Sequence, residues 1–485
     1  MSTQHIRQRI QSEFRRQQLM LDKEALALLV EYVEHAPTGI DAVYTVIDKL
    51  EAGLVHLYAF DAGDLRDRYR MYQDRLLLLY QRLRRDKTFS KPALAEADMD
   101  QNATYCQLTD VKAMLGCTGQ TRFLLGCISQ LQDGTYYLED MTGSLQLDLA
   151  QCQTSSGLYT ENCIVIAEGE LDHRGIFRAS ALGMPPVESQ EDSRAATKGL
   201  QMFGNNNLKA SDWMAVEEAE QAAQANRLVV LSDVWLDKPE VLDQLHMVFS
   251  GLGFNGLDTV PSAFVLMGNF QSQPAPTAST DYSALRENFK TLGSIISQYQ
   301  RLQEESKFIF VPGPGDPGPA NVLPRPALPA YFTADLRQLL PTAVFASNPC
   351  RLRLYTQQVV LFRSNLQNHM RRLCLIPPTC SSGERVSSAD ALFEHLCVTV
   401  LQQSHLCPVP LENQSVYWQY DHALHLYPAP DLVVLADSAA SAQFVFKDTA
   451  FVNPGSFSKR TFAAYNIYAR EVELSEVPTE EMEAG

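Results

Sequence analysis

Five polar residues stand close behind apolar stretches of the chain, where side chains of neighbouring elements would gather. They are Asp233, Asn269, Asp316, His405 and Asp437. Carboxylate and amide oxygens and imidazole nitrogens are the ligands that divalent cations take in proteins. Two such cations, a few ångströms apart, clamp the attacking and leaving oxygens of a phosphate ester during its hydrolysis. The first chemistry to consider is therefore metal-dependent phosphoester cleavage.

The order and surroundings of these residues resemble the calcineurin-like metallophosphoesterases. Active members carry D-x-H, G-D-x-x-D, G-N-H-D, a lone His and G-H-x-H after successive strands, with N-P-G-S in a late turn. This chain has Asp233 at the first motif, His405 as the lone histidine and N-P-G-S at 453–456. The resemblance implies an α/β sandwich with its site at the strand ends.

Most ligand positions of that pattern hold other residue types here. Trp235 stands at the histidine of D-x-H, Asn269 at the bridging aspartate, and Ser272 at the second aspartate of G-D-x-x-D. The string at 313–316 is G-P-G-D, and 435–439 is L-A-D-S-A where G-H-x-H is expected. Only Asp233 and His405 remain as ligands, and two ligands do not hold a binuclear site.

We therefore expect no catalytic residue, no metal and no cofactor, and we interpret the five polar positions as vestigial. Asp233 is expected to order the turn after its strand, and His405 to be a packing histidine. The pair His422 and His425 lacks a nearby cysteine or a helix bearing glutamate, so it is not predicted to bind a metal. Seven prolines between 312 and 329 predict a rigid loop suited to partner contact.

The elements that position these residues alternate apolar runs with helical patterns after about residue 189. The expected strands are Leu228–Leu231, Phe264–Met267, Phe308–Val311, Val344–Phe345, Val359–Phe362, Leu432–Leu435, Phe444–Phe446 and Phe451–Val452. The expected helices are Trp213–Ala225, Pro239–Gly251, Tyr282–Glu304 and Ala389–Gln403. This order predicts an α/β domain with a multi-stranded sheet.

Between Arg122 and Gly183 the period changes to that of short strands with turns at Asp133-Gly134, Thr142-Gly143 and Arg174-Gly175. Five strands are expected, at Phe123–Leu131, Thr135–Glu139, Ser144–Leu149, Cys163–Leu171 and Ile176–Leu182. Their layout matches an oligonucleotide/oligosaccharide-binding (OB) barrel. Tyr136 and Tyr137 are the only adjacent aromatics and basic residues are few, so protein docking or a structural role is favoured over binding of single strands.

The first sixty residues predict three short amphipathic helices. A longer helix after Asp64 has an apolar stripe that we expect to pack on the chain's own body; the stripe is Leu65, Tyr69, Tyr72, Leu76, Leu79 and Leu83. Its end is basic, at Arg82, Arg84, Arg85 and Lys87, which we interpret as favourable charge at a helix C-terminus. The polar stretch from Lys91 to Asn102 is interpreted as a linker.

Together these patterns predict a multidomain α+β protein. We expect a small N-terminal helical domain at 1–60, a connecting helix and linker at 61–105, an OB-fold at 106–188 and an inactive calcineurin-like phosphoesterase domain, an α/β sandwich, at 189–485. A length of 485 residues agrees with two to four domains.

The charge balance bears on partners. Forty Lys and Arg against 57 Asp and Glu give a net charge of −17, which argues against a protein that grips a phosphate backbone by itself. The ten cysteines include no C-x-x-C pair, as in reduced, intracellular proteins. The sequence shows neither a signal peptide nor an apolar run of the ~20 residues that cross a bilayer, so we expect an intracellular chain without a membrane contact.

An OB barrel followed by a degenerate phosphoesterase resembles the B subunits of eukaryotic replicative DNA polymerases, and within them the second subunits of DNA polymerase epsilon. The strings that carry this resemblance lie between about 104 and 462; among them are 124–131, 137–149, 231–237, 310–318, 348–351, 416–418 and 453–457. Three short helices precede Leu54, where the family pattern has room for more.

The resemblance implies a non-catalytic accessory subunit in the nucleus, acting in chromosomal replication and repair. Its implied partners are the zinc-bearing C-terminal domain of the catalytic subunit, GINS and the replicative helicase through the N-terminal helices, small histone-fold accessory subunits, and DNA indirectly. Two other interpretations stay open from the residues alone. One is an active metal-dependent phosphodiesterase or nuclease that uses Asp233 and His405, and the other is a single-stranded DNA-binding module built on the barrel.

Overall fold

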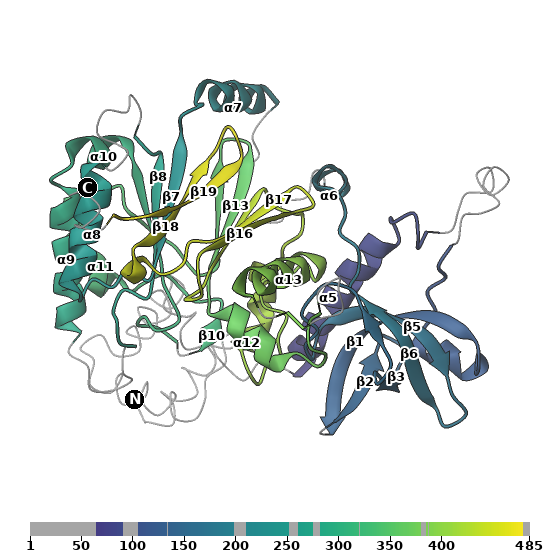
Figure 1. Ribbon diagram of the computed structural model, residues 1–485. Helices are drawn as coiled ribbons and strands as arrows, with labels where there is room; N and C mark the ends of the chain where they lie inside the picture. The colour runs from purple at the N-terminus through teal and green to yellow at the C-terminus, as the bar shows by residue number, and fades with distance from the viewer. Residues whose placement is uncertain are drawn as a thin grey trace, which may run out of the picture. The chain divides into compact units, whose positions relative to one another are not determined.

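The computed structural model describes residues 65–90, 105–132, 134–197, 210–251, 260–274, 282–319, 321–379, 385–386 and 388–478 (Figure 1). The chain divides into two units, Met1–Tyr72 and Gln73–Gly485. The described residues do not include the three expected N-terminal helices, the expected linker or Asp133 of the first expected turn. All features below belong to the second unit unless stated.

Two stacked mixed sheets form the larger part of this unit. The first has the order β11, β9, β8, β7, β18 and β19, formed by Val344–Phe345, Lys307–Val311, Ala263–Met267, Arg227–Ser232, Thr461–Asn466 and Glu471–Glu476. The second has the order β12, β13, β15, β17 and β16, formed by Cys350–Leu354, Gln357–Arg363, Leu432–Ala436, Thr449–Asn453 and Ala442–Phe446. The short strands β10 (Val322–Leu323) and β14 (Ser415–Val416) pair separately.

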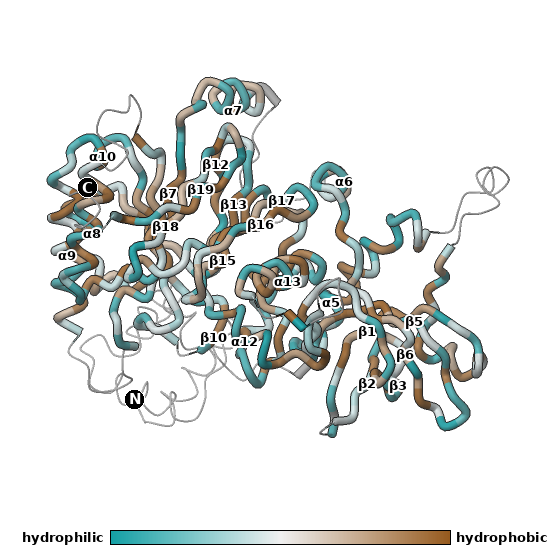
Figure 2. Tube along the Cα trace, viewed as in Figure 1, coloured by the Kyte–Doolittle hydropathy of each residue, from teal (hydrophilic) through white to brown (hydrophobic). Residues whose placement is uncertain are grey.

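Helices cover the outer face of each sheet, and Figure 2 shows the brown, apolar strands enclosed between them. The first sheet packs on α8 (Pro239–Ser250), α9 (Ser283–Ile296), α10 (Gln300–Glu305) and α11 (Ala330–Leu339). The second packs on α12 (Leu366–Leu373) and α13 (Ala389–Gln402). A third apolar cluster fills the space between the sheets, with Val230, Val265 and Val434 among its members. The central strands are parallel and buried on both faces, which explains their unbroken apolar runs.

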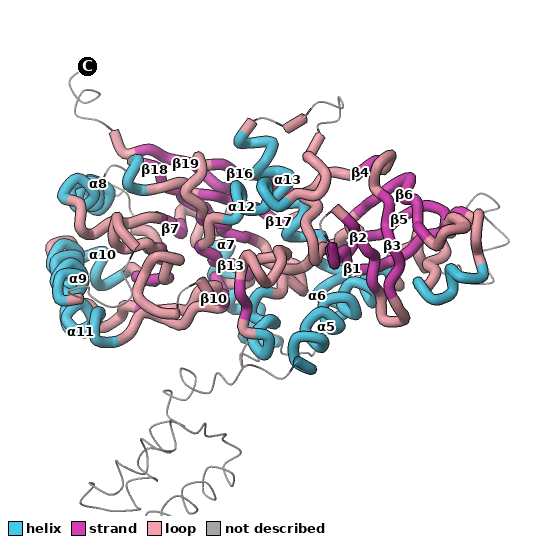
Figure 3. Tube along the Cα trace, turned by 90° about the horizontal axis from the view of Figure 1, so that it is seen from below, coloured by secondary structure: helices cyan, strands magenta, loops and turns pink. Residues whose placement is uncertain are grey.

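The second expected domain is an OB barrel. Its strands are β1 (Thr121–Gln132), β2 (Thr135–Glu139), β3 (Ser144–Asp148), β4 (Gln153–Thr154), β5 (Ile164–Leu171) and β6 (Ile176–Gly183). The order β3, β2, β1, β5, β6 closes through the β3–β6 pairing, so the five expected strands form a barrel. Figure 3 shows these strands in magenta near α5 and α6 (Gln190–Ala196). The fold class expected for these two parts is confirmed.

The structure also differs from the expected elements in places. The helix expected at Tyr282–Glu304 is two helices, because α9 ends at Ile296 and α10 begins at Gln300. Strands β12, β18 and β19 and helices α11 and α12 were not expected. Exposed residues alternate along β19, and α12 has a charged sequence. Neither segment therefore shows a clear apolar pattern from which a strand or helix is predicted.

Helix α5 (Leu65–Leu83) confirms only part of the expected apolar stripe. Leu76, Leu79 and Leu83 are buried against the barrel strands β1 and β5. Tyr69, in the first unit, is 62% exposed. Two arginines, Arg75 and Arg82, are buried on this helix. Arg82 lies in its last turn, the place where we expect a basic side chain to be favourable. Helix α7 (Ala210–Ala222) and the 3-10 turns η2 (Val111–Gly116), η3 (Trp418–Leu424) and η4 (Phe457–Lys459) complete the described helices.

No described helix is long and apolar enough to span a bilayer.

Candidate functional site at the strand ends

The carboxyl ends of the parallel strands meet around one arginine. Arg363 is the last residue of β13, and its side chain is 1% exposed. Its Nη2 donates to Asp233 Oδ1 at 2.6 Å, and its Nε donates to the Gly268 carbonyl at 2.8 Å. Its Nη1 donates to Asn365 Oδ1 at 2.8 Å and to the Ala436 carbonyl at 3.3 Å. A guanidinium therefore occupies the place where the sequence pattern suggested cation ligands.

Asp233 lies directly after β7 with a φ of 56°, the left-handed region. Its Oδ1 accepts the Arg363 bond and also a 3.3 Å bond from the Asn269 backbone N–H. These contacts join Asp233 to β13 and to the loop after β8; its expected role in ordering the turn after its own strand stays a prediction. Trp235, at the position of the motif's histidine, is partly buried and packs against the apolar core between the first sheet and its helices. It offers no ligand atom to the strand ends.

Asp316 and Asn269 join the loops after β8 and β9. The Asp316 carboxylate accepts bonds from the Phe270 N–H at 2.8 Å and the Gly313 N–H at 2.7 Å. Asn269 Oδ1 accepts from the Gly315 N–H at 2.7 Å. Burial raises the pKa of Asp316 to about 6, although the two amide donors and the neighbouring arginines oppose that shift. Both side chains are committed to backbone donors.

The Pro-rich loop that follows is fixed by two buried polar side chains. Arg325 donates to the carbonyls of Pro319 at 2.8 Å and Asp316 at 2.6 Å. Asn348 donates to the carbonyls of Pro312 at 3.0 Å and Arg363 at 2.7 Å. The loop is thus held to the strand ends by hydrogen bonds as well as by its prolines.

Asp437 lies after β15 and supports the start of α12. Its Oδ2 accepts from the Gln367 N–H at 2.9 Å and its Oδ1 from the Ala439 N–H at 3.0 Å. A carboxylate near the first amides of a helix is a favourable pairing of charge and dipole. The Asp437 carboxylate therefore caps a helix, and its two oxygens are engaged by backbone amides.

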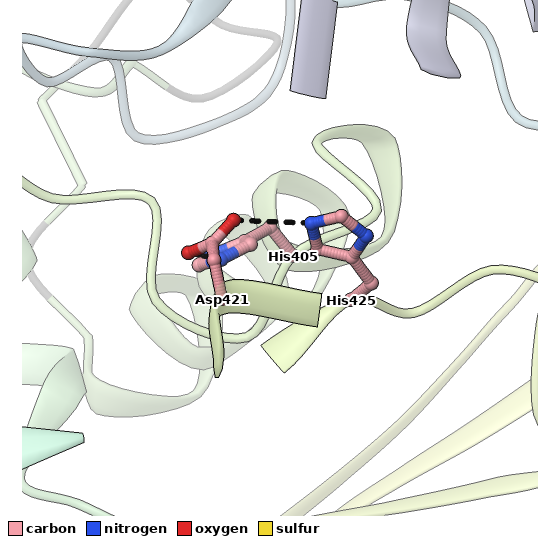
Figure 4. Close-up of side chains that lie close together, drawn as sticks. All are labelled: His405, Asp421 and His425. Carbon is pink, nitrogen blue, oxygen red and sulfur yellow. Dashed lines mark hydrogen bonds and ion pairs between the residues drawn. The ribbon is translucent and has the colours of Figure 1, made fainter. Parts of the chain in front are cut away.

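His405 lies in a separate buried cluster with Asp421 and His425 (Figure 4). Its Nε2 is 3.2 Å from Asp421 Oδ1, and His425 Nε2 is 3.1 Å from Asp421 Oδ2. Among the residues that the structure describes, this is the only group of three or more His, Cys, Asp or Glu with ligand atoms within 4.8 Å of one another. His422 is exposed and takes no part in it.

The hydrogen bonds of this cluster do not fit a metal. The Cys407 N–H donates to His405 Nδ1 at 3.0 Å, so a neutral His405 carries its proton on Nε2 and has no lone pair there. Both Asp421 oxygens also accept from Arg75, Nε to Oδ2 at 2.9 Å and Nη2 to Oδ1 at 2.5 Å. The guanidinium supplies the positive charge that a cation would bring.

Burial shifts the acid–base properties of the cluster. It lowers the pKa of His405 to about 4, and the nearby Arg75 charge adds to the effect. Burial alone would raise the pKa of Asp421, but the interactions with His405 and Arg75 outweigh it and hold the pKa below its usual range. Near neutral pH the cluster is thus an ion pair flanked by a neutral His405.

Sequence reasoning brought Asp233 and Asn269 correctly to one edge, and Asp316 beside them. It missed Arg75 and Arg363, which neutralise the two clusters. A signal for Arg363 was present, because it ends the apolar string V-V-L-F-R of a buried strand. Arg75 lies four residues before the buried Leu79, on the buried face of α5.

An OB barrel joined to a two-sheet α/β sandwich, with a buried arginine at the strand ends, defines the class of this protein. The family model for the DNA polymerase alpha/epsilon B subunit matches residues 228–445, and the model "DNA polymerase epsilon subunit 2-like, OB-fold domain" matches 65–186.

Three relatives show how far the similarity extends. The DNA polymerase epsilon B subunit of Arabidopsis thaliana is 42% identical, covering 85% of this chain and 77% of that protein. DNA polymerase epsilon subunit 2 of Homo sapiens is 39% identical, covering 83% and 74%. That of Mus musculus is 38% identical, also covering 83% and 74%. The chain therefore belongs to the B-subunit family of DNA polymerase epsilon, the non-catalytic accessory subunits of a replicative polymerase.

Among solved structures, an archaeal phosphodiesterase is 9% identical, covering 52% of this chain and 99% of its own, with a TM-score of 0.28. A score this low adds nothing to the assignment of the fold.

Proposed function

We propose that this chain is a rigid scaffold that holds the zinc-bearing C-terminal domain of the polymerase's catalytic subunit in the nucleus. Membership of the epsilon B-subunit family implies a catalytic-subunit partner. The four-part division at 1–60, 61–105, 106–188 and 189–485 belongs to this proposal. So does the vestigial status of Asp233, Asn269, Asp316, His405 and Asp437, which is supported by their bonds to backbone donors and, for Asp233, to Arg363.

The observation that carries the proposal is the hydrogen-bonded joint between barrel and sandwich. Gln403, just after α13, accepts from the Ile164 N–H and donates to the Ile164 carbonyl, both at 2.8 Å. The Leu158 N–H donates to Thr399 Oγ1 at 2.7 Å. All these groups are buried, where an unpaired polar atom costs about 1–3 kcal/mol, so the joint resists opening. A fixed angle between two domains is what a scaffold requires.

The charge of the barrel favours protein over nucleic acid as its ligand. Between 121 and 183 the chain has eight Asp and Glu but three Lys and Arg. Binding of single strands depends on a positive groove with stacking aromatics. An acidic barrel repels a phosphate backbone, so we place DNA in contact with other subunits and only indirectly with this one.

The remaining partners extend the same scaffold. We propose that residues 1–60 contact GINS and so connect the polymerase to the replicative helicase, and that small histone-fold subunits join in the holoenzyme. The family resemblance supports these contacts.

Co-expression with the C-terminal domain of a DNA polymerase epsilon catalytic subunit tests the main proposal. We expect a one-to-one complex that survives gel filtration. A chain that elutes alone, while remaining folded by circular dichroism, would refute it. Deleting 1–60 should leave this complex intact and abolish GINS capture. In a fluorescence assay at low salt, binding of a single-stranded oligonucleotide by the chain alone would contradict the indirect DNA contact.

A further inference from the structure

The Arg363 guanidinium joins four oxygens that come from four strand ends. Asp233 and Gly268 follow β7 and β8 of the first sheet, while Ala436 ends β15 and Asn365 follows β13 of the second. The four donor–acceptor distances run from 2.6 to 3.3 Å. One side chain therefore connects the two sheets at the edge where the sequence pattern of active phosphoesterases has its metal ligands.

Burial makes the charge of this arginine necessary. The side chains of Arg363 and Asp233 are 1% and 4% exposed. A buried carboxylate without a counter-charge is strongly destabilising, and a guanidinium stays charged at any physiological pH. Its planar fork also lets one group serve several acceptors in fixed directions.

We propose that Arg363 is a built-in replacement for divalent cations, which holds the strand ends together and makes the frame independent of metal. The acceptors around it are all oxygens: one carboxylate, one side-chain amide and two backbone carbonyls. This is the ligand chemistry that Mg²⁺, Ca²⁺ and Mn²⁺ prefer. Removal of the guanidinium should therefore leave a gap that a small hard cation stabilises.

The first test uses the unmodified full-length chain. We expect its melting temperature to be unchanged by EDTA or by 1 mM Mn²⁺, and elemental analysis of the purified chain to find no stoichiometric metal. A metal present at one or more ions per chain, or a melting temperature lowered by EDTA, would overturn the proposal.

The second test compares Arg363→Met with the double variant Asp233→Asn/Arg363→Met. We expect the single variant to melt several degrees below the unmodified chain, and 1 mM Mn²⁺ to raise its melting temperature by roughly 3 °C. The double variant buries no unpaired carboxylate. It should melt above the single variant, and Mn²⁺ should not change its melting temperature. Equal Mn²⁺ shifts in both variants, or no Mn²⁺ shift in either, would overturn the replacement.

Two further variants keep the test decisive if Arg363→Met does not fold. Arg363→Lys retains a charge that fills the gap, so it should fold, melt below the unmodified chain and gain nothing from Mn²⁺. If Arg363→Met is insoluble, Mn²⁺ in the refolding buffer should raise its soluble yield, and an unchanged yield counts against the proposal. Arg371→Met, at an exposed position of α12, is the matched control and should behave as the unmodified chain.

Discussion

Arg75 and Asp421, 346 positions apart in the sequence, form a bidentate ion pair in which both side chains are 6% exposed. The pair fixes α5 to the segment after β14. Arg82, further along the same helix, makes a second attachment. Arg82 Nη1 donates to Ser404 Oγ at 2.6 Å and its Nη2 to the Pro185 carbonyl at 2.9 Å. Burial lowers the pKa of Arg82 to about 10, which still leaves it charged at neutral pH. The helix is thus anchored by arginines as well as by its leucines.

Arg75→Met should lower the free energy of unfolding by about 3–5 kcal/mol, because it leaves the buried Asp421 carboxylate without its counter-charge. Urea unfolding followed by circular dichroism measures this difference. The double variant Arg75→Met/Asp421→Asn should recover part of the loss. If the loss of unfolding free energy in the double variant equals the sum of the losses in Arg75→Met and Asp421→Asn, the ion pair is not the source of the effect.

His405→Gln should change how stability depends on pH. The pKa of His405 falls from 6.5 in the unfolded chain to about 4 in the folded one. Its contribution is therefore complete above pH 6.5 and is lost as the pH falls toward 4, by up to about 3 kcal/mol. Glutamine keeps an N–H donor near the Nε2 position and does not titrate in this range. The free energy of unfolding should thus fall less steeply between pH 6.5 and 4 in the variant.

The exposed His422 provides the control for that experiment. His422→Gln should reproduce the pH dependence of the unmodified chain. Identical slopes for the unmodified chain and His405→Gln would show that His405 has an ordinary pKa in the folded protein.

Gln403→Leu should weaken the joint between barrel and sandwich. It leaves both the N–H and the carbonyl of Ile164 buried without a partner, at a cost of about 2–5 kcal/mol for the two groups. The neighbouring Gln402→Leu is the matched control, because its side-chain Oε1 has no hydrogen bond among the described atoms. Thermal unfolding should separate the two variants clearly; equal melting temperatures would argue against a hydrogen-bonded joint.

Gly268→Ala should disturb the strand ends. A Cβ at this position would lie 1.8 Å from Asp316 Oδ2 and 2.5 Å from the Gly313 nitrogen, so the loop after β9 must move. We expect a loss of at least about 3 kcal/mol in the free energy of unfolding. Gly116→Ala, where a Cβ meets nothing within 4 Å, should cost little by the same measurement.

The strands could be predicted because their burial is regular. Val229, Val265 and Val434 belong to buried strands whose sequences are unbroken apolar runs. In the barrel, part of β6 alternates buried and exposed residues over 177–180. Strand β19 has glutamates at exposed positions and too few apolar residues to produce a pattern. The sequence predicts one helix over 282–304 because its apolar periodicity continues across 297–299. The structure breaks the helix there, between α9 and α10.

The polar site could be predicted only in part, since sequence position does not reveal hydrogen-bond partners. Asp233 and Asp316 were placed at one edge because parallel strands end together. Their partners, Arg363 and the backbone amides of Phe270 and Gly313, come from other strands and become visible only in three dimensions. His405 was assigned to the same edge by motif order, yet it contacts Asp421 in another part of the fold.

The position of β18 has a consequence for how the protein is made. This strand, Thr461–Asn466, lies between β7 and β19 in the first sheet, and it pairs with β7 from the far end of the sequence. During translation β7 emerges more than two hundred residues before its neighbour, so one edge of the sheet stays open until residues 461–466 have been synthesised. Completion of the first sheet therefore waits for a strand far downstream of β7, and a ribosome that stalls before residue 461 releases a polypeptide with an exposed strand, a natural target for chaperones and for aggregation.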